Sequence, residues 1–166
     1  MMYKIKNHII CGFPGVGKSS ASKINEDVAD IESSEFRWPV EWKNVDELDQ
    51  MKHERKLNQN WVRDYVDHIE AMASQYGYNY CLISCHKEVR EELNARNIPY
   101  MIVVPDRSLK DEYLVRYLIR GDSFAFIDCI NKHWDEWLSE IDKSDVPVIH
   151  LSTGQFIGDI LPLKKD

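Results

Sequence analysis

The chain lacks the long apolar segments and the paired cysteines that mark several classes of protein. No apolar stretch approaches the roughly 20 residues that a membrane-spanning helix needs, and the first residues do not have the pattern of a secretory signal peptide. Its four cysteines include no C-x-x-C pair. We therefore expect a soluble, cytoplasmic protein with reduced thiols and no membrane partner.

The sequence also lacks a complete zinc-ligand set and an excess of positive charge. Cys81, Cys85 and His86 lie close together, but no second cluster completes the tetrahedral set that a structural zinc ion needs. Lysine and arginine number 21 against 28 aspartate and glutamate residues, which gives a net charge of −7. This balance provides no general attraction to a polyanion, so contact with nucleic acid requires a local basic patch.

The 166 residues are enough to bury a core without disulfides, and no repeat, low-complexity tract or linker divides them, so we expect a single domain over 1–166. Short apolar runs alternate with segments of helical period, which predicts an α/β fold with a mostly parallel, five-stranded sheet between two helical layers. Strands are predicted over about 3–11, 28–31, 80–83, 100–104 and 146–151.

Helices are predicted over about 17–25, 57–77, 87–96, 109–120 and 123–141. Trp134 and Trp137 share the apolar face of the last helix and are predicted to be core residues. The segment 33–52 has no clear period and is predicted as a loop with room for a short helix. The tail after residue 151 has no strong period either.

A phosphate-binding loop follows the first predicted strand, since residues 12–19 fit the pattern G-x-x-x-x-G-K-[ST] in full. Such a loop wraps backbone N–H groups around a polyphosphate and opens into a helix whose positive end faces the phosphates. Lys18 is expected to reach the β- and γ-phosphates, and the Ser19 hydroxyl to bind Mg²⁺. We predict that ATP and Mg²⁺ bind to Gly12, Phe13, Pro14, Gly15, Val16, Gly17, Lys18, Ser19 and Ser20.

Two carboxylates follow the second predicted strand, at the edge where open parallel sheets bind ligands. Asp30 and Glu32 are two residues apart, so on a strand their side chains point to the same side. They could hold Mg²⁺, with Asp30 as the ligand, or take a proton from an attacking hydroxyl. Alternatively, one of them caps a helix or turn. Ser33 and Ser34 come next, as substrate contacts or as caps of that turn.

Polar residues also follow the third and fourth predicted strands. Ser84 and His86 are expected beside the phosphate loop, where they contact substrate or instead form the cap and first turn of the next helix. Asp106 follows the fourth strand and is similar to a Walker B aspartate, although a turn or N-cap role fits it equally well.

Arg116 and Arg120 lie four residues apart and therefore on one face of a predicted helix. Charge builds on a transferring phosphoryl group in the transition state, so arginines in a lid over about 107–123 could close over that group. The alternative is a solvated helix face with ordinary ion pairs to Asp106, Asp111 and Glu112.

Several short runs, together with the phosphate loop, make the chain resemble a known group of kinases. They are D-x-E-S-S-x-F over 30–36, S-x-H-K over 84–87, V-x-P-D over 103–106, K-x-E-Y-x-x-R-Y-x-x-R-G over 110–121 and W-x-x-W over 134–137. The chain resembles small P-loop kinases of the nucleoside monophosphate kinase class, and within it is most similar to phage-type 5-hydroxymethyluracil DNA kinases.

The resemblance implies a P-loop three-layer sandwich with a helical lid that contains Arg116 and Arg120. It places Asp30 and Glu32 at the acceptor or the metal. The substrate contacts that we associate with these runs are Ser33, Ser34, Phe36, Ser84 and His86.

We therefore expect a phosphotransferase that moves the γ-phosphoryl group of MgATP in line to a hydroxyl or phosphate of a nucleotide-like acceptor. 5-Hydroxymethyluracil in DNA is one candidate, and nucleic acid would then be a partner through its modified base. Because the negative net charge does not suit DNA, a free nucleoside or nucleoside monophosphate is the alternative. An ATPase or an ATP-binding module without an acceptor also stays open. A GTPase is disfavoured, since Asn131-Lys132-His133-Trp134-Asp135 misses N-K-x-D by one residue.

Overall fold

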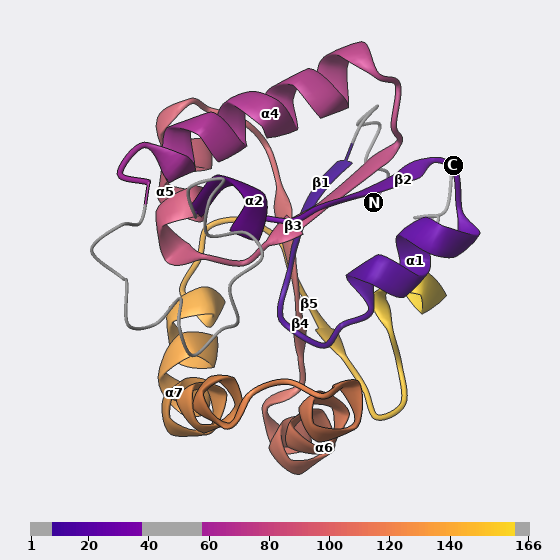
Figure 1. Cartoon of the computed structure of the whole chain (residues 1–166), viewed down its shortest axis with the longest axis vertical. Helices are drawn as coiled ribbons and strands as arrows, with labels where there is room; N and C mark the ends of the chain where they lie inside the picture. Colours follow the sequence, from indigo (N-terminus) through magenta and orange to yellow (C-terminus); the bar gives the residue numbers. More distant parts are fainter. Residues whose placement is uncertain (1–7, 38–57, 162–166) are drawn as a thin grey trace.

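A parallel sheet of five strands forms the centre of the structure, a computed structural model that describes residues 8–37 and 58–161 (Figure 1). The strand order is β2-β3-β1-β4-β5, and every neighbouring pair is parallel. The strands are β1 His8–Gly12, β2 Val28–Ile31, β3 Tyr80–Ser84, β4 Met101–Pro105 and β5 Val148–Leu151. The predicted α/β fold is confirmed.

Helices cover both faces of this sheet (Figure 1). On one side lie α4 (Trp61–Gln75), α5 (Lys87–Ala95) and α7 (Phe124–Asp142). On the other side lie α1 (Lys18–Ile24) and the short 3₁₀ helix η4 (Ile157–Ile160), which contact each other. Within the described ranges, no helix combines the length and the apolar character that crossing a membrane would require.

Two short elements and one longer helix complete the described chain. After β2 the chain forms α2 (Ser34–Arg37), which packs on α4. After β4 it forms η3 (Arg107–Leu109) and then α6 (Lys110–Arg120), which packs on α7. A left-handed Gly121 ends α6, as the sequence predicts.

The structure shifts several predicted boundaries. The helix expected over 57–77 covers 61–75, and the strand expected from 146 begins at 148. Pro147 has no N–H for the ladder, but its carbonyl accepts a hydrogen bond from Ile102 N at 2.9 Å. The tail, for which no period was found, contains η4. Residues 3–7 of the first expected strand and most of the segment 33–52 lie outside the described residues.

The two tryptophans of α7 differ in burial. Trp134 is 1% exposed, packs edge-on to Phe13 at 5.5 Å and donates its indole N–H to the carbonyl of Arg107 at 3.0 Å. It is a core residue, as predicted. Trp137 is only partly buried and stacks on the ring of the partly buried His133 at 5.0 Å.

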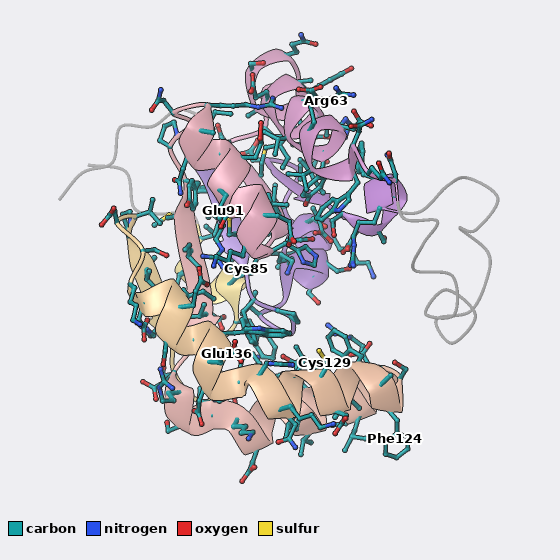
Figure 2. All side chains as sticks on the ribbon, turned by 90° about the vertical axis from the view of Figure 1, so that its left-hand side faces the viewer. Arg63, Cys85, Glu91, Phe124, Cys129 and Glu136 are labelled. Carbon is teal, nitrogen blue, oxygen red and sulfur yellow. The ribbon has the colours of Figure 1, made fainter. Side chains whose placement is uncertain are left out.

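An ion pair joins α5 to α7. Figure 2 presents the face that these two helices form, with the labelled Cys85 between them. The buried guanidinium of Arg90 donates to both carboxylate oxygens of Glu140, at 2.7 and 3.2 Å. Such a bidentate pair fixes direction as well as distance. It holds the start of α5, and with it the end of β3, against α7.

The cysteines of the described chain are all free thiols. They are Cys11, Cys81, Cys85 and Cys129.

Candidate active site

The phosphate-binding loop connects β1 to α1 and has the backbone that its glycines allow. Gly15 and Gly17 have φ values of +88° and +92°, which residues with a Cβ rarely adopt. Both also touch neighbouring rings. A Cβ on Gly15 would lie 2.9 Å from a ring carbon of Tyr117, and one on Gly17 would lie 3.0 Å from the ring of Phe156. The glycine pattern therefore reflects close packing as well as backbone conformation.

Every carbonyl from Gly12 to Val16 accepts a hydrogen bond. In chain order the donors are Lys18 Nζ (2.7 Å), Val16 N (3.2 Å), Tyr117 Oη (2.7 Å), Arg116 Nη1 (2.9 Å) and Ile157 N (2.8 Å). By contrast, the N–H groups of Gly15 and Gly17 find no acceptor among the residues that the structure describes. N–H groups left unpaired in such a loop form a concave site for an anion.

Lys18 is turned back onto the loop, where its ammonium group donates to the carbonyl of Gly12. Burial lowers its pKa, an effect that the nearby Glu32 and Asp30 oppose and Arg120 reinforces. A desolvated ammonium gains from a phosphate partner more than an exposed one does. Lys18 is thus placed to exchange the Gly12 carbonyl for a phosphate oxygen. The adjacent Ser19 and Ser20 are exposed at the start of α1.

Asp30 and Glu32 lie on the β2 side of this loop and differ in their surroundings. Asp30 is half-buried, and its Oδ1 is buried without a hydrogen-bond partner in the described chain. Burial raises the pKa of Asp30, the charge of Glu32 raises it further, and Lys18 opposes both. Glu32 is exposed. A partly desolvated carboxylate with a free oxygen suits a general base or a metal ligand.

Neither carboxylate caps α2. The first turn of that helix is closed by the N–H groups of Phe36 and Arg37, which donate to the Ser33 carbonyl at 2.9 and 3.0 Å. The capping alternative for Asp30 and Glu32 is therefore wrong.

A chain of hydrogen bonds joins the ends of β2 and β3. Ser84 Oγ donates to Ser33 Oγ at 3.0 Å, and Ser33 Oγ lies 3.4 Å from Nε2 of His86. The hydroxyl of Tyr65 donates to the Ile31 carbonyl and accepts from Ser84 N at 3.0 Å. The structure thus brings together three of the predicted substrate residues.

The other two predicted substrate residues lie on α2. Ser34 is exposed at its first position. Phe36 packs on the rings of Tyr65 and His68 of α4, at 5.4 and 5.3 Å.

His86 sits at the N-cap position of α5 without capping it through its side chain. Its ring meets the edge of Trp61 at 5.4 Å. Burial, together with the positive charges of Arg37, Lys18 and Arg90, lowers its pKa to about 4. The imidazole is therefore neutral at pH 7 and can exchange hydrogen bonds with a hydroxyl.

The two arginines of α6 have different partners. Arg116 is mostly buried, with Nη1 on the Gly15 carbonyl and Nη2 on Glu112 at 2.9 Å. Arg120 has a half-exposed side chain that pairs with Asp122 at 2.6 Å. Of the two, Arg120 is the arginine with room to move.

Asp106 caps the short η3 helix. Its carboxylate accepts from Ser108 N at 3.0 Å and from Ser108 Oγ at 2.7 Å. These bonds lower the pKa of Asp106. The N-cap role is confirmed, and no phosphate-side role is needed to explain this residue.

Sequence reasoning missed the residues that surround the phosphate loop from outside. Tyr113 and Tyr117 of α6 lie against Gly15, and Phe156 lies against Gly17. The spacing of Tyr113, Arg116 and Tyr117 at three and four residues was a signal for a shared face, but it gave no sign of what that face covers. Phe156 comes from a tail without a period, so the sequence offered no signal for it.

Comparisons with known proteins give a structural likeness only. No family model matches the chain, and no curated protein matches it. Among solved structures, the chain is similar to the tunicamycin resistance protein of Deinococcus radiodurans, with a TM-score of 0.54 and 14% identity over 93% of this chain and 90% of that one. The likeness shows the fold. It is an α/β fold with a parallel sheet of five strands.

The low pKa of His86 predicts how acid affects stability. Because its folded-state pKa of about 4 lies below the ordinary value of 6.5, the unfolded chain binds the proton more readily. His86 therefore contributes stability above pH 6.5 that is lost as the pH falls toward 4. We expect the thermal midpoint of a His86→Gln variant to fall less between pH 7 and pH 5 than that of the wild type. Equal slopes in the two proteins would contradict this environment for His86.

Proposed function

We propose that the protein is a kinase that transfers the γ-phosphoryl group of MgATP to a hydroxyl group. The observation that carries the proposal is the placement of an unpartnered, half-buried Asp30 carboxylate across from a loop whose Gly15 and Gly17 N–H groups are free to bind an anion. A phosphate cradle alone would suit any nucleotide-binding protein. A carboxylate on its acceptor side adds a group that can orient or deprotonate an attacking hydroxyl.

The charges on the acceptor side favour a hydroxyl over a phosphate acceptor. Asp30 and Glu32 lie close enough to Lys18 to affect its pKa, and the imidazole of His86 carries no charge at neutral pH. A nucleoside monophosphate would bring a dianion toward two carboxylates, which is unfavourable in a partly buried site. A neutral hydroxyl can instead hydrogen-bond to Ser33, Ser84 and His86, which already form one network.

The residues fit Mg²⁺, which prefers hard oxygen ligands. The exposed Ser19 hydroxyl and the Asp30 carboxylate would hold it, directly or through water. When bound, it would neutralise charge on the β- and γ-phosphates. In the proposed reaction Lys18 leaves the Gly12 carbonyl for the γ-phosphate, Arg120 offsets charge on the transferring group, and Asp30 accepts the proton of the hydroxyl.

The proposal also concerns which molecule carries the hydroxyl that accepts the phosphoryl group. The resemblance to 5-hydroxymethyluracil DNA kinases points to a hydroxymethyl group on a DNA base, and a free nucleoside is the alternative. A P-loop ATPase or an ATP-binding module without an acceptor is the second candidate function. It is the outcome that the following assay would reveal.

Incubation with γ-labelled ATP and Mg²⁺ tests the proposal directly. The panel contains nucleosides, nucleoside monophosphates and DNA with 5-hydroxymethyluracil. We expect label on a hydroxyl acceptor, and none with Lys18→Ala, which removes the ammonium group that we expect to reach the phosphates. Label only in free phosphate would make the protein an ATPase, and wild-type transfer by Lys18→Ala would remove the assigned role of the loop.

A second prediction separates the two carboxylates. Asp30→Asn should lower transfer by about 10²- to 10⁴-fold, the usual contribution of a general base, whereas Glu32→Gln should lower it by less than about tenfold. The pKa of Asp30 is raised in the folded protein, so its ionised form opposes folding at pH 7. Asp30→Asn should therefore keep or raise the thermal midpoint of the ligand-free protein. If Glu32→Gln is the more damaging change, the two roles must be exchanged.

A further inference from the structure

We infer that α6 is a fixed frame for the phosphate-binding loop, and that Tyr117 and Arg116 are positioning residues that orient its peptide groups. The inference rests on the proposed binding of a triphosphate and concerns how that site is shaped. It differs from the expectation that both arginines of α6 move as a lid.

Tyr117 is the first part of this frame. Its side chain is fully buried, its ring packs edge-on to Phe126 at 5.2 Å, and its hydroxyl donates to the Pro14 carbonyl at 2.7 Å. In a trans peptide the C=O and N–H bonds lie in one plane and point in opposite directions. Because Tyr117 holds the Pro14 carbonyl, the N–H of Gly15 is directed to the other side of the loop. That N–H has no acceptor among the residues that the structure describes.

Arg116 is the second part, and its neighbours fix it on all sides. Its guanidinium lies between the rings of Tyr113 and Phe156, at 4.2 and 4.1 Å. One edge donates to the Gly15 carbonyl at 2.9 Å, and the other pairs with Glu112. Because Arg116 holds the Gly15 carbonyl, the N–H of Val16 points the opposite way, toward the Phe13 carbonyl. Val16 N donates to that carbonyl at 3.2 Å and so closes the turn of the loop.

Glu112 is itself held by the segment after β5. It accepts hydrogen bonds from the Thr153 hydroxyl and from Gly154 N, at 3.2 Å for the latter. In the same segment, Ile157 N donates to the Val16 carbonyl at 2.8 Å. This bond directs the N–H of Gly17 away from Ile157, in the same way that Tyr117 directs the N–H of Gly15. To reach a phosphate, Arg116 would have to give up its hydrogen bonds and both stacking partners. It is therefore anchored, and its effect on the phosphates passes through the backbone.

α6 supplies a matched pair of tyrosines for the test. Tyr113 and Tyr117 are both fully buried one turn apart, but the Tyr113 hydroxyl is buried without a hydrogen-bond partner in the described chain. Affinities of MgATP and of tripolyphosphate are measured by titration calorimetry, and thermal midpoints are recorded for each variant. We expect Tyr117→Phe to weaken both ligands about tenfold, the equivalent of one net hydrogen bond. Tyr113→Phe should change them less than about twofold, with similar midpoints for the two variants.

Arg116→Lys provides the second readout. Lysine cannot bridge the Gly15 carbonyl and Glu112 as a planar fork does. As a positioning residue, Arg116 should affect KM for ATP by about tenfold and leave kcat at saturating ATP within about threefold. A loss in kcat of more than about a hundredfold would show that it contacts the transferring group and would overturn the inference.

Two binding results would also overturn it. One is wild-type affinity in Tyr117→Phe, and the other is an equal loss in Tyr117→Phe and Tyr113→Phe. If the wild type binds neither MgATP nor tripolyphosphate, the proposed function fails and the inference falls with it. If the wild type binds both ligands and the tyrosine variants give either of these two results, the role of α6 as a frame is rejected, but the proposed function is not.

Discussion

The hydrogen bonding of the Gly12–Val16 carbonyls is the constraint on which the rest of the structure depends. Each carbonyl has its own donor, and the donors come from the loop itself, from α6 and from the start of η4. These partners leave the N–H groups of Gly15 and Gly17 as the unsatisfied side of the loop. The fold brings three distant parts of the chain together, and their hydrogen bonds fix the direction of the peptide groups in one backbone segment.

Charge is divided across this loop in a way that suits transfer of a phosphoryl group. Lys18 and Arg120 lie on the phosphate side, and the pKa of Lys18 responds to both Asp30 and Glu32 across from it. The ion pair of Arg90 with Glu140 ties the start of α5, which carries His86 at its N-cap, to α7. In the proposed reaction, Asp30 and Glu32 would repel a second phosphate, a repulsion that a neutral hydroxyl does not meet.

The sequence predicted the elements well because each has a strong local signal. Strands such as Met101–Pro105 are continuous apolar runs, and α4 repeats its apolar residues at helical spacing. The phosphate loop could be predicted because its motif is local. The roles of Arg116, Glu112 and Phe156 could not, because they depend on contacts between residues about 40 to 100 positions apart. For Asp106 the local pattern was present but ambiguous, since an acid after a strand fits a cap and a catalytic role equally well. The structure shows the cap.

The most direct test of this account is a crystal structure of the protein with Mg²⁺ and a non-hydrolysable ATP analogue. We predict that the γ-phosphate lies on the N–H groups of Gly15 and Gly17, that Lys18 has left the Gly12 carbonyl for that phosphate, and that Tyr117 and Arg116 still hold the carbonyls of Pro14 and Gly15. A triphosphate bound elsewhere, or bound here with Lys18 still on Gly12, would contradict the account.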